Sequence, residues 1–102
     1  MSSISRFEDI VAWQRARELT KQVYALSARG SFRHDYGLKD QIRRAAGSVM
    51  HNIAEGFDAG SSKEFIRFLS YARRSATEVQ SQLYIALDQA YITDKEFDHL
   101  RP

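Results

Sequence analysis

One apolar row constrains the fold of this chain more than any other feature. Between residues 65 and 90, apolar side chains follow one another at alternating steps of four and three residues, namely Phe65, Leu69, Ala72, Ala76, Val79, Leu83, Ala86 and Ala90. Because an α-helix completes a turn every 3.6 residues, such a row lies along one side of a helix. A row of this length predicts a long helix whose antiparallel neighbours cross it at about 20°.

Two shorter rows have similar, heptad-like spacing. One consists of Ala12, Ala16, Leu19, Val23 and Leu26, and the other of Leu38, Ile42, Ala45, Val49 and Ile53. Helix breakers are scarce, since the single proline is residue 102 and there are only five glycines. The sequence predicts helices near 9–28, 37–55, 62–90 and 94–101. The expected fold is all-α, an antiparallel up-and-down four-helix bundle with a short fourth helix, forming a single domain over residues 1–102.

Glycines and capping residues separate these helices. Gly30 is expected to end the first, and Gly56 to end the second as a left-handed residue just past its last turn. Ser61 with Glu64 has the spacing of a capping box that opens the third helix, and Thr93 opens the fourth in the same way.

The fourth helix has room for only two turns before Pro102. Its apolar residues, Phe97 and Leu100, can therefore cover only one end of a bundle whose third helix is about 40 Å long. Either the chain has been cut short, or another chain covers the remaining core.

The net charge of +2 is unevenly distributed. Residues 1–74 hold 13 basic and 8 acidic side chains, whereas residues 75–102 hold 2 and 5. Eleven of the fifteen basic residues are arginine, which suits bidentate phosphate contacts, although an ordinary solvated surface is the alternative. The nucleic-acid-binding candidates are Arg43, Lys63, Arg67 and Arg74, with Arg15 and Lys39 as weaker ones.

Apolar side chains also lie beside the core rows, where an isolated bundle does not need them. On the third helix this stripe holds Ile66, Arg73, Tyr84 and Tyr91, and on the first it holds Trp13, Arg17, Thr20 and Tyr24. For the Trp13–Tyr24 stripe three interpretations are open: a subunit interface, an edge of the monomer core, or a base-stacking surface. A homo-oligomer would bury both stripes.

The segment HNIAEGF, residues 51–57, gathers polar groups that resemble a catalytic cluster. Ser48 and His51 are neighbours at i, i+3, but no orienting acid or oxyanion hole is indicated nearby. His51 and Glu55 span only one face of a metal ion, and no further ligand follows. We therefore expect no catalytic residue, metal or cofactor. The polar row is interpreted instead as structural anchors at a helix end: Arg44, Asn52, Glu55 and Gly56.

Membrane and secretory signals are missing from the sequence. There is no cysteine, no apolar run near the roughly 20 residues of a membrane span, and no apolar stretch in the opening MSSISRFEDI. A cytoplasmic protein without a membrane partner is expected.

Several of these segments together resemble a known family of four-helix-bundle proteins, whose founding members are encoded by intervening sequences in bacterial 23S ribosomal RNA genes. The similarity covers about residues 7–100 and is carried by FEDIVAWQRARELTKQVYAL, YGLKDQIRRAAGSVMHNIAEGF, SSKEFIRFLSYARRSATEVQSQL and YITDKEF. The family's arginine pair and NIAEG motif correspond to Arg43, Arg44 and residues 52–56. Met50 departs from the pattern, since many members have proline there, and the fourth helix is shorter than usual.

The resemblance implies rings, typically pentamers, and no enzymatic activity. A more distant branch comprises accessory proteins of diversity-generating retroelements, which bind nucleic acid and a reverse transcriptase. We therefore expect a non-enzymatic homo-oligomer, a homopentamer, that binds nucleic acid. RNA is the favoured ligand, and DNA is the other candidate. The alternative is a protein-interaction adapter, or an accessory subunit for a partner protein such as a reverse transcriptase.

Overall fold

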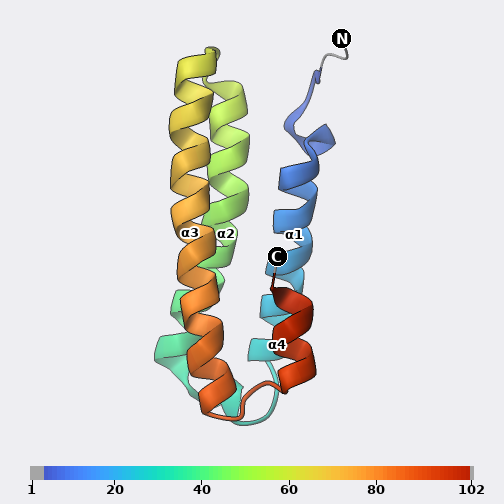
Figure 1. The fold of residues 1–102 in the computed structure, drawn as a ribbon, viewed down its shortest axis with the longest axis vertical. Coiled ribbons are helices and arrows are strands. Elements are labelled where there is room, and N and C mark those ends of the chain that lie inside the picture. The colour runs from blue at the N-terminus through green and yellow to red at the C-terminus, as the bar shows by residue number, and fades with distance from the viewer. Residues whose placement is uncertain (1–3, 102) are drawn as a thin grey trace.

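The computed structural model describes residues 4–101 and is all-α. Its elements are the short 3₁₀ helix η1 (Phe7–Asp9), α1 (Val11–Ser27), η2 (Gly30–His34), α2 (Tyr36–Asp58), α3 (Ser62–Asp88) and α4 (Asp94–Leu100). α2 and α3 lie side by side as an antiparallel pair, and α1 stands beside them with the short α4 next to its lower half (Figure 1). The predicted all-α fold with four helices and a short fourth one is confirmed.

The predicted helix starts are confirmed with one difference. At α4 the capping box is complete, because Thr93 Oγ1 accepts the Glu96 N–H at 3.1 Å and Glu96 accepts the Thr93 N–H at 2.9 Å. At α3, Ser61 Oγ accepts the Glu64 N–H at 3.2 Å, but the Glu64 carboxylate turns to Arg67 instead. This box is therefore only half formed.

Gly56 does not end α2, and that prediction is wrong. The helix continues to Asp58, and the left-handed glycine of this turn is Gly60, with φ of +86°. Gly56 is buried where α2 and α3 approach each other, and a Cβ atom added to it would lie 2.6 Å from Phe68 Cβ. Its missing side chain permits close helix packing. At the end of α1 the prediction holds, because Gly30 has φ of +54° three residues after Ser27.

Two apolar clusters make up the core. The larger contains Val23, Ile42, Val79 and Leu83 and is covered by α4, whose Phe97 and Leu100 are buried. The smaller lies toward the other end of the bundle and contains Ala16, Val49, Ile53 and Ala72. α2 packs closely against α3, and α1 packs mainly on α2. The short α4 therefore covers one end of the core, as its length predicts.

The turn from α3 to α4 has a non-glycine residue in a left-handed conformation. Ala90 has φ of +59°, the Tyr91 N–H donates to Ala86 O at 2.9 Å, and the Ala90 N–H donates to Leu87 O at 3.0 Å. This pair of bonds is a Schellman motif, whose left-handed position usually holds glycine. After this turn, the partly buried Tyr91 side chain packs against the larger cluster.

A candidate nucleic-acid interface on α3

Three side chains on the exposed side of α3 form a stack, which we call the α3 ladder: Arg67, Tyr71 and Arg74. The guanidinium carbons of Arg67 and Arg74 each lie 5.8 Å from the centre of the Tyr71 ring. The spacing of four and three residues places all three on one side of the helix. The rings of Phe68 and Tyr71 also pack in a T-shaped arrangement, with their centres 5.8 Å apart. The ladder alternates cation, aromatic ring and cation along about two turns.

The charges of the ladder are available to a ligand. Arg67 pairs with Glu64 at 2.5 Å, and this hydrogen bond raises the pKa of Arg67 above its ordinary value. Both side chains are more than one third exposed, so the pair contributes little stability and is easily exchanged. Within residues 4–101, neither Arg74 nor Lys63 forms an ion pair. Lys63, one turn before Arg67, is exposed and extends the basic side of α3.

A small polar network ties α2 to α3 next to the ladder. Ser75 Oγ donates to Ser48 Oγ at 3.0 Å across the two helices, and Asn52 Nδ2 donates to Ser48 O at 2.8 Å and to Ser48 Oγ at 3.0 Å. Asn52 thus binds the preceding turn of its own helix and also takes part in the network between α2 and α3. Arg44 and Glu55 are exposed, and within residues 4–101 neither side chain forms a hydrogen bond or ion pair, so of these polar residues only Asn52 has the contacts of an anchor.

Arg43 binds the end of α1 in the same chain. Its Nε donates to the buried Ser27 Oγ at 2.8 Å, and its Nη2 donates to Tyr24 O at 3.3 Å. The guanidinium also lies 4.4 Å from the centre of the Tyr24 ring. A cation at a helix C-terminus is favourable because the last carbonyl groups carry partial negative charge. These contacts join α1 to α2. They also occupy two nitrogen donors, Nε and Nη2, with which Arg43 would otherwise bind a phosphate.

The remaining two candidates lie elsewhere. Lys39 donates to Arg33 O at 3.2 Å and lies 5.0 Å from the Tyr36 ring, near the start of α2. Arg15 is exposed on α1, on the side that faces α3. Of the six predicted nucleic-acid-binding residues, the structure brings together Lys63, Arg67 and Arg74. Tyr71 is not among the six predicted residues, although its spacing of four and three residues from Arg67 and Arg74 places it between them.

The predicted interface stripes divide between the core and the surface. Trp13 is half-buried and packs edge-on against Phe7 at 5.1 Å, with Arg17 5.9 Å above its ring. Tyr91 stacks on the buried Phe32 at 5.0 Å, and its hydroxyl donates to Asp35 at 2.9 Å. These aromatic side chains therefore pack within their own chain.

Other members of the stripes are exposed. Ile66 is 66% exposed, Tyr84 52% and Tyr24 48%, and Arg73 is also at the surface. Tyr84 additionally contacts Phe97 of α4, with ring centres 4.7 Å apart. Exposed apolar area therefore remains on α3.

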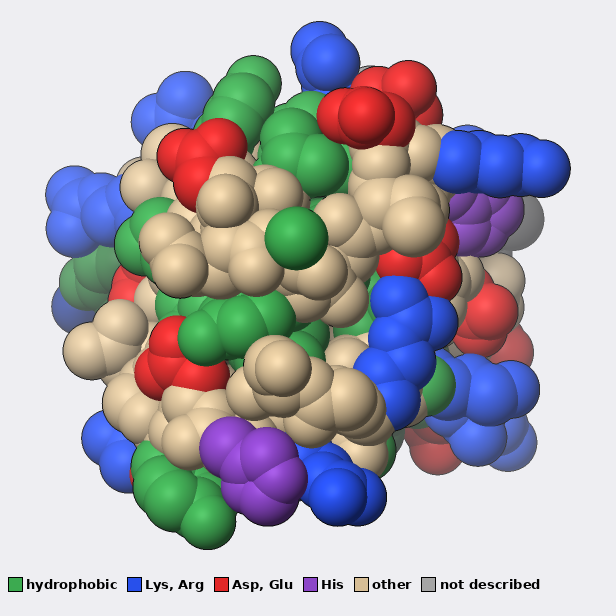
Figure 2. All heavy atoms as spheres, turned by 90° about the horizontal axis from the view of Figure 1, so that it is seen from below, with side chains coloured by type: hydrophobic (Ala, Val, Ile, Leu, Met, Phe, Trp, Pro, Cys, Tyr) green, Lys and Arg blue, Asp and Glu red, His purple; other side chains and the backbone are tan. Residues whose placement is uncertain are grey.

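The end of the molecule that carries the α3–α4 turn has no concentrated charge. Basic side chains project from several sides of its periphery, with acidic groups between them (Figure 2).

The polar row of α2 forms no metal site. In the part of the chain that the structure describes, no three His, Asp or Glu side chains are grouped so that they could hold a metal ion. His51 is exposed, and the Ser48 hydroxyl takes part in the network with Asn52 and Ser75. No helix within residues 4–101 is both long and apolar enough to cross a membrane.

Comparison with known proteins agrees with the fold. No curated protein matches the sequence. The family model described as 23S rRNA-intervening sequence protein matches residues 8–102, which is nearly the whole chain and includes all four α-helices. The chain therefore belongs to the 23S rRNA-intervening sequence protein family.

Proposed function

We propose that this protein is a non-enzymatic, cytoplasmic, nucleic-acid-associated protein that binds single-stranded RNA through the α3 ladder. The observation that carries the proposal is the stack of the half-buried Tyr71 between the exposed Arg67 and Arg74. Guanidinium groups bind phosphates, and an aromatic ring between them offers a platform for a base, a combination used by sequence-tolerant single-strand binders. The family's description names a 23S rRNA intervening sequence, and a nucleic-acid-associated role is consistent with it.

Assembly into a ring of copies, with five as the expected number, is the second part of the proposal. The exposed Ile66 and Tyr84 on α3, together with Ile85 at 47% exposure, offer apolar area for contacts between copies. A ring repeats the ladder, so the charge of +2 per chain becomes about +10 in a pentamer, and several weak contacts act together. Binding of this kind is avid, weakly sequence-specific and steeply salt-dependent.

Fluorescence anisotropy with a labelled single-stranded RNA of about 20 nucleotides tests the binding surface. Arg67→Glu/Arg74→Glu should weaken binding at least about thirtyfold and flatten its salt dependence, because two phosphate contacts become repulsive. The matched control is Arg33→Glu/Lys21→Glu, which changes the net charge equally at two exposed positions away from the ladder. If both double variants lose the same affinity, only net charge matters and the ladder is not the site.

Native mass spectrometry tests the assembly separately. The unmodified chain should give a single closed oligomer, and Ile66→Glu, which places a charge in the expected interface, should dissociate it. A monomer at about 100 µM in the unmodified chain would contradict the assembly. It would leave the RNA experiment, which compares variants at equal concentration, unaffected.

A further inference from the structure

The two arginines of the α3 ladder differ in what else they contact. Within residues 4–101, the Arg74 side chain forms no hydrogen bond and no ion pair, although its guanidinium lies 5.8 Å from the centre of the Tyr71 ring. Arg67 donates from Nη2 to a carboxylate oxygen of Glu64, and from Nη1 to the Tyr71 hydroxyl at 3.5 Å. One arginine is therefore open to a phosphate, whereas the other already binds an anionic group of its own chain.

The bond from Arg67 Nη2 matters because of the geometry of the guanidinium group. A phosphate binds arginine most strongly through two parallel N–H bonds, either from Nη1 and Nη2 or from Nε and Nη2. Nη2 belongs to both pairs, and it is the nitrogen that Glu64 occupies. Glu64 therefore prevents a two-bond contact between Arg67 and a phosphate, and its negative charge also repels the phosphate.

Glu64 has a second group to bind in the same turn of the chain. It is the third residue of α3, and Ser61 is the N-cap whose Oγ accepts the Glu64 N–H. In a complete capping box, a glutamate at this position accepts the N–H of the N-cap residue. Within residues 4–101 the Ser61 N–H has no hydrogen-bond partner, and the carboxylate that would accept it is turned toward Arg67. The half-formed box therefore leaves one unused donor for Glu64.

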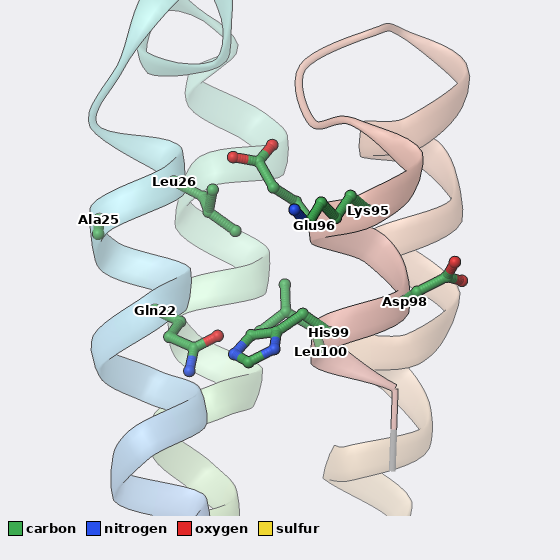
Figure 3. Close-up of a pocket in the computed structure, with 8 residues that line it drawn as sticks. All are labelled: Gln22, Ala25, Leu26, Lys95, Glu96, Asp98, His99 and Leu100. Atoms are coloured by element: carbon green, nitrogen blue, oxygen red, sulfur yellow. The ribbon is translucent and has the colours of Figure 1, made fainter.

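The start of α4 shows the complete arrangement in the same chain. Glu96 is the third residue of α4, and it accepts the Thr93 N–H at 2.9 Å while it also binds Arg29. Glu96 extends into the crevice between α1 and α4 (Figure 3), where Arg29 reaches it from the turn after α1. Arg67 instead lies one turn further along the same helix as Glu64, so the ion pair draws the carboxylate away from the N-cap. At α3 the arginine and the N-cap therefore compete for one glutamate.

Only a small energy separates the two positions of Glu64. The side chains of Arg67 and Glu64 are 54% and 37% exposed, and solvent weakens an ion pair of this kind. Both positions keep the carboxylate in the first turn of α3, where the partial positive charge of the helix N-terminus favours it. An anion that Arg74 also binds can therefore displace Glu64 from Arg67.

We propose that Glu64 is an internal competitor for the α3 ladder. It occupies Arg67 in the free protein, and a bound phosphate group moves it to the Ser61 N–H, where it completes the capping box. The inference rests on the proposed function for its ligand, the phosphate backbone of a single-stranded RNA. Binding is thereby coupled to the first turn of α3, which gains a hydrogen bond when the ligand arrives. Weakly held anions are disfavoured, because only a ligand that contacts Arg67 and Arg74 together offsets the loss of the ion pair.

Substitution of Glu64 tests the competition in the RNA-binding assay. Glu64→Gln removes the ion pair but keeps an oxygen that can accept the Ser61 N–H, so the affinity for the labelled single-stranded RNA should rise about fivefold. The matched control is Glu78→Gln, which removes one carboxylate four residues after Arg74. Glu78 is exposed and forms no ion pair within residues 4–101. This control should raise the affinity less than about twofold, through net charge alone.

Amide hydrogen exchange, followed by NMR on the full chain, tests the movement of Glu64 without RNA. Arg67→Met removes the guanidinium and leaves Glu64 free to bind the Ser61 N–H, which should exchange at least about threefold more slowly than in the unmodified chain. Arg67→Met/Glu64→Ala has no carboxylate at position 64 and should lose this protection. Addition of the RNA to the unmodified chain should slow the exchange of the same amide.

Two results overturn the proposal. One is an equal rise in affinity for Glu64→Gln and Glu78→Gln, which would mean that only net charge matters. The other is an unchanged exchange rate of the Ser61 amide in Arg67→Met, which would mean that Glu64 does not move to the N-cap. The RNA site itself fails separately, if Arg67→Glu/Arg74→Glu binds RNA as tightly as the unmodified chain. Because the exchange experiment on Arg67→Met needs no RNA, it distinguishes the two failures.

Discussion

The α-carbon of Gly56 passes so close to Phe68 that a methyl group on the glycine would lie 2.6 Å from Phe68 Cβ and 3.0 Å from a ring carbon of Phe65. Both phenylalanines belong to α3, so the contact sets how closely α2 and α3 pack at this end. Backbone-anchored atoms such as a Cβ cannot move aside without shifting the helix. Glycine is therefore required at position 56 by the close packing of α2 and α3, and not by a left-handed backbone conformation.

Gly56→Ala should therefore destabilise the protein by about 2 kcal/mol or more, because the added methyl forces α2 and α3 apart. Urea unfolding followed by circular dichroism measures the change. Gly37→Ala in the same helix is the control, since a Cβ atom there meets only Asp35 Oδ1, at 3.9 Å. It should stabilise by about 0.5–1 kcal/mol. Equal effects at the two glycines would contradict the close approach.

The ion pair between Arg29 and Glu96 makes the free energy of unfolding depend on pH in the acidic range. The hydrogen bond from Arg29, aided by the Thr93 N–H, lowers the pKa of Glu96 to about 2 from an ordinary value of 4.5. A carboxylate whose pKa is depressed in the folded state stabilises it above its unfolded pKa and loses this contribution as the pH falls. Stability should decline from about pH 4.5 toward pH 2, by no more than about 1 kcal/mol because solvent screens this exposed pair.

Glu96→Gln is the matched variant, because glutamine can keep the capping contact with Thr93 but not the charge. Thermal unfolding at pH 7 and pH 3 should show a smaller loss for this variant than for the unmodified chain. An identical loss in both would mean that another carboxylate causes the pH dependence.

Ala90 adopts a conformation that costs an L-amino acid energy. Ala90→Gly should stabilise the chain by about 1 kcal/mol, since glycine enters the left-handed region without the Cβ clash. Its neighbour Gln89 has φ of −84°, so Gln89→Gly should instead lose about 0.5–1 kcal/mol through chain entropy. Urea midpoints of the two variants should move in opposite directions. A shift in the same direction would exclude strain at Ala90.

Arg43 and Arg44 are adjacent in sequence but differ in structural role. Arg43→Ala removes two hydrogen bonds to the end of α1, including the one to the buried Ser27, and should cost about 1–2 kcal/mol. Arg44→Ala, at an exposed position, should change stability by less than about 0.5 kcal/mol. Chemical denaturation of the two variants distinguishes them. Similar losses would show that the contacts of Arg43 contribute nothing of their own.

The helices were predictable because local signals determine them. The apolar row from Phe65 to Ala86 lies within α3, and the capping box at Thr93 opens α4. The last member of the predicted row, Ala90, falls in the turn after α3, which ends at Asp88. The role of Gly56 was not predictable, because a glycine near a helix end fits either a left-handed cap or a close approach. Only the position of Phe68 on another helix distinguishes the two.

The candidate site was predictable in part for the same reason. Lys63, Arg67 and Arg74 share one helix side, so their alignment follows from spacing alone. Arg43 was grouped with them by charge, yet its partners Ser27 and Tyr24 lie on another helix, and no pattern within α2 reveals them. That α4 covers only one end of the core follows from its length of seven residues.

The packing of α1 mainly on α2 has a consequence for motion. α2 and α3 pack extensively against each other, whereas the side of α1 that faces α3 borders an open space lined by Val11, Ala16 and Leu69. Segments with fewer buried contacts open at lower free energy than the rest of a molecule. The amide hydrogens of α1 should therefore exchange with solvent faster than those in the middle of α2 and α3.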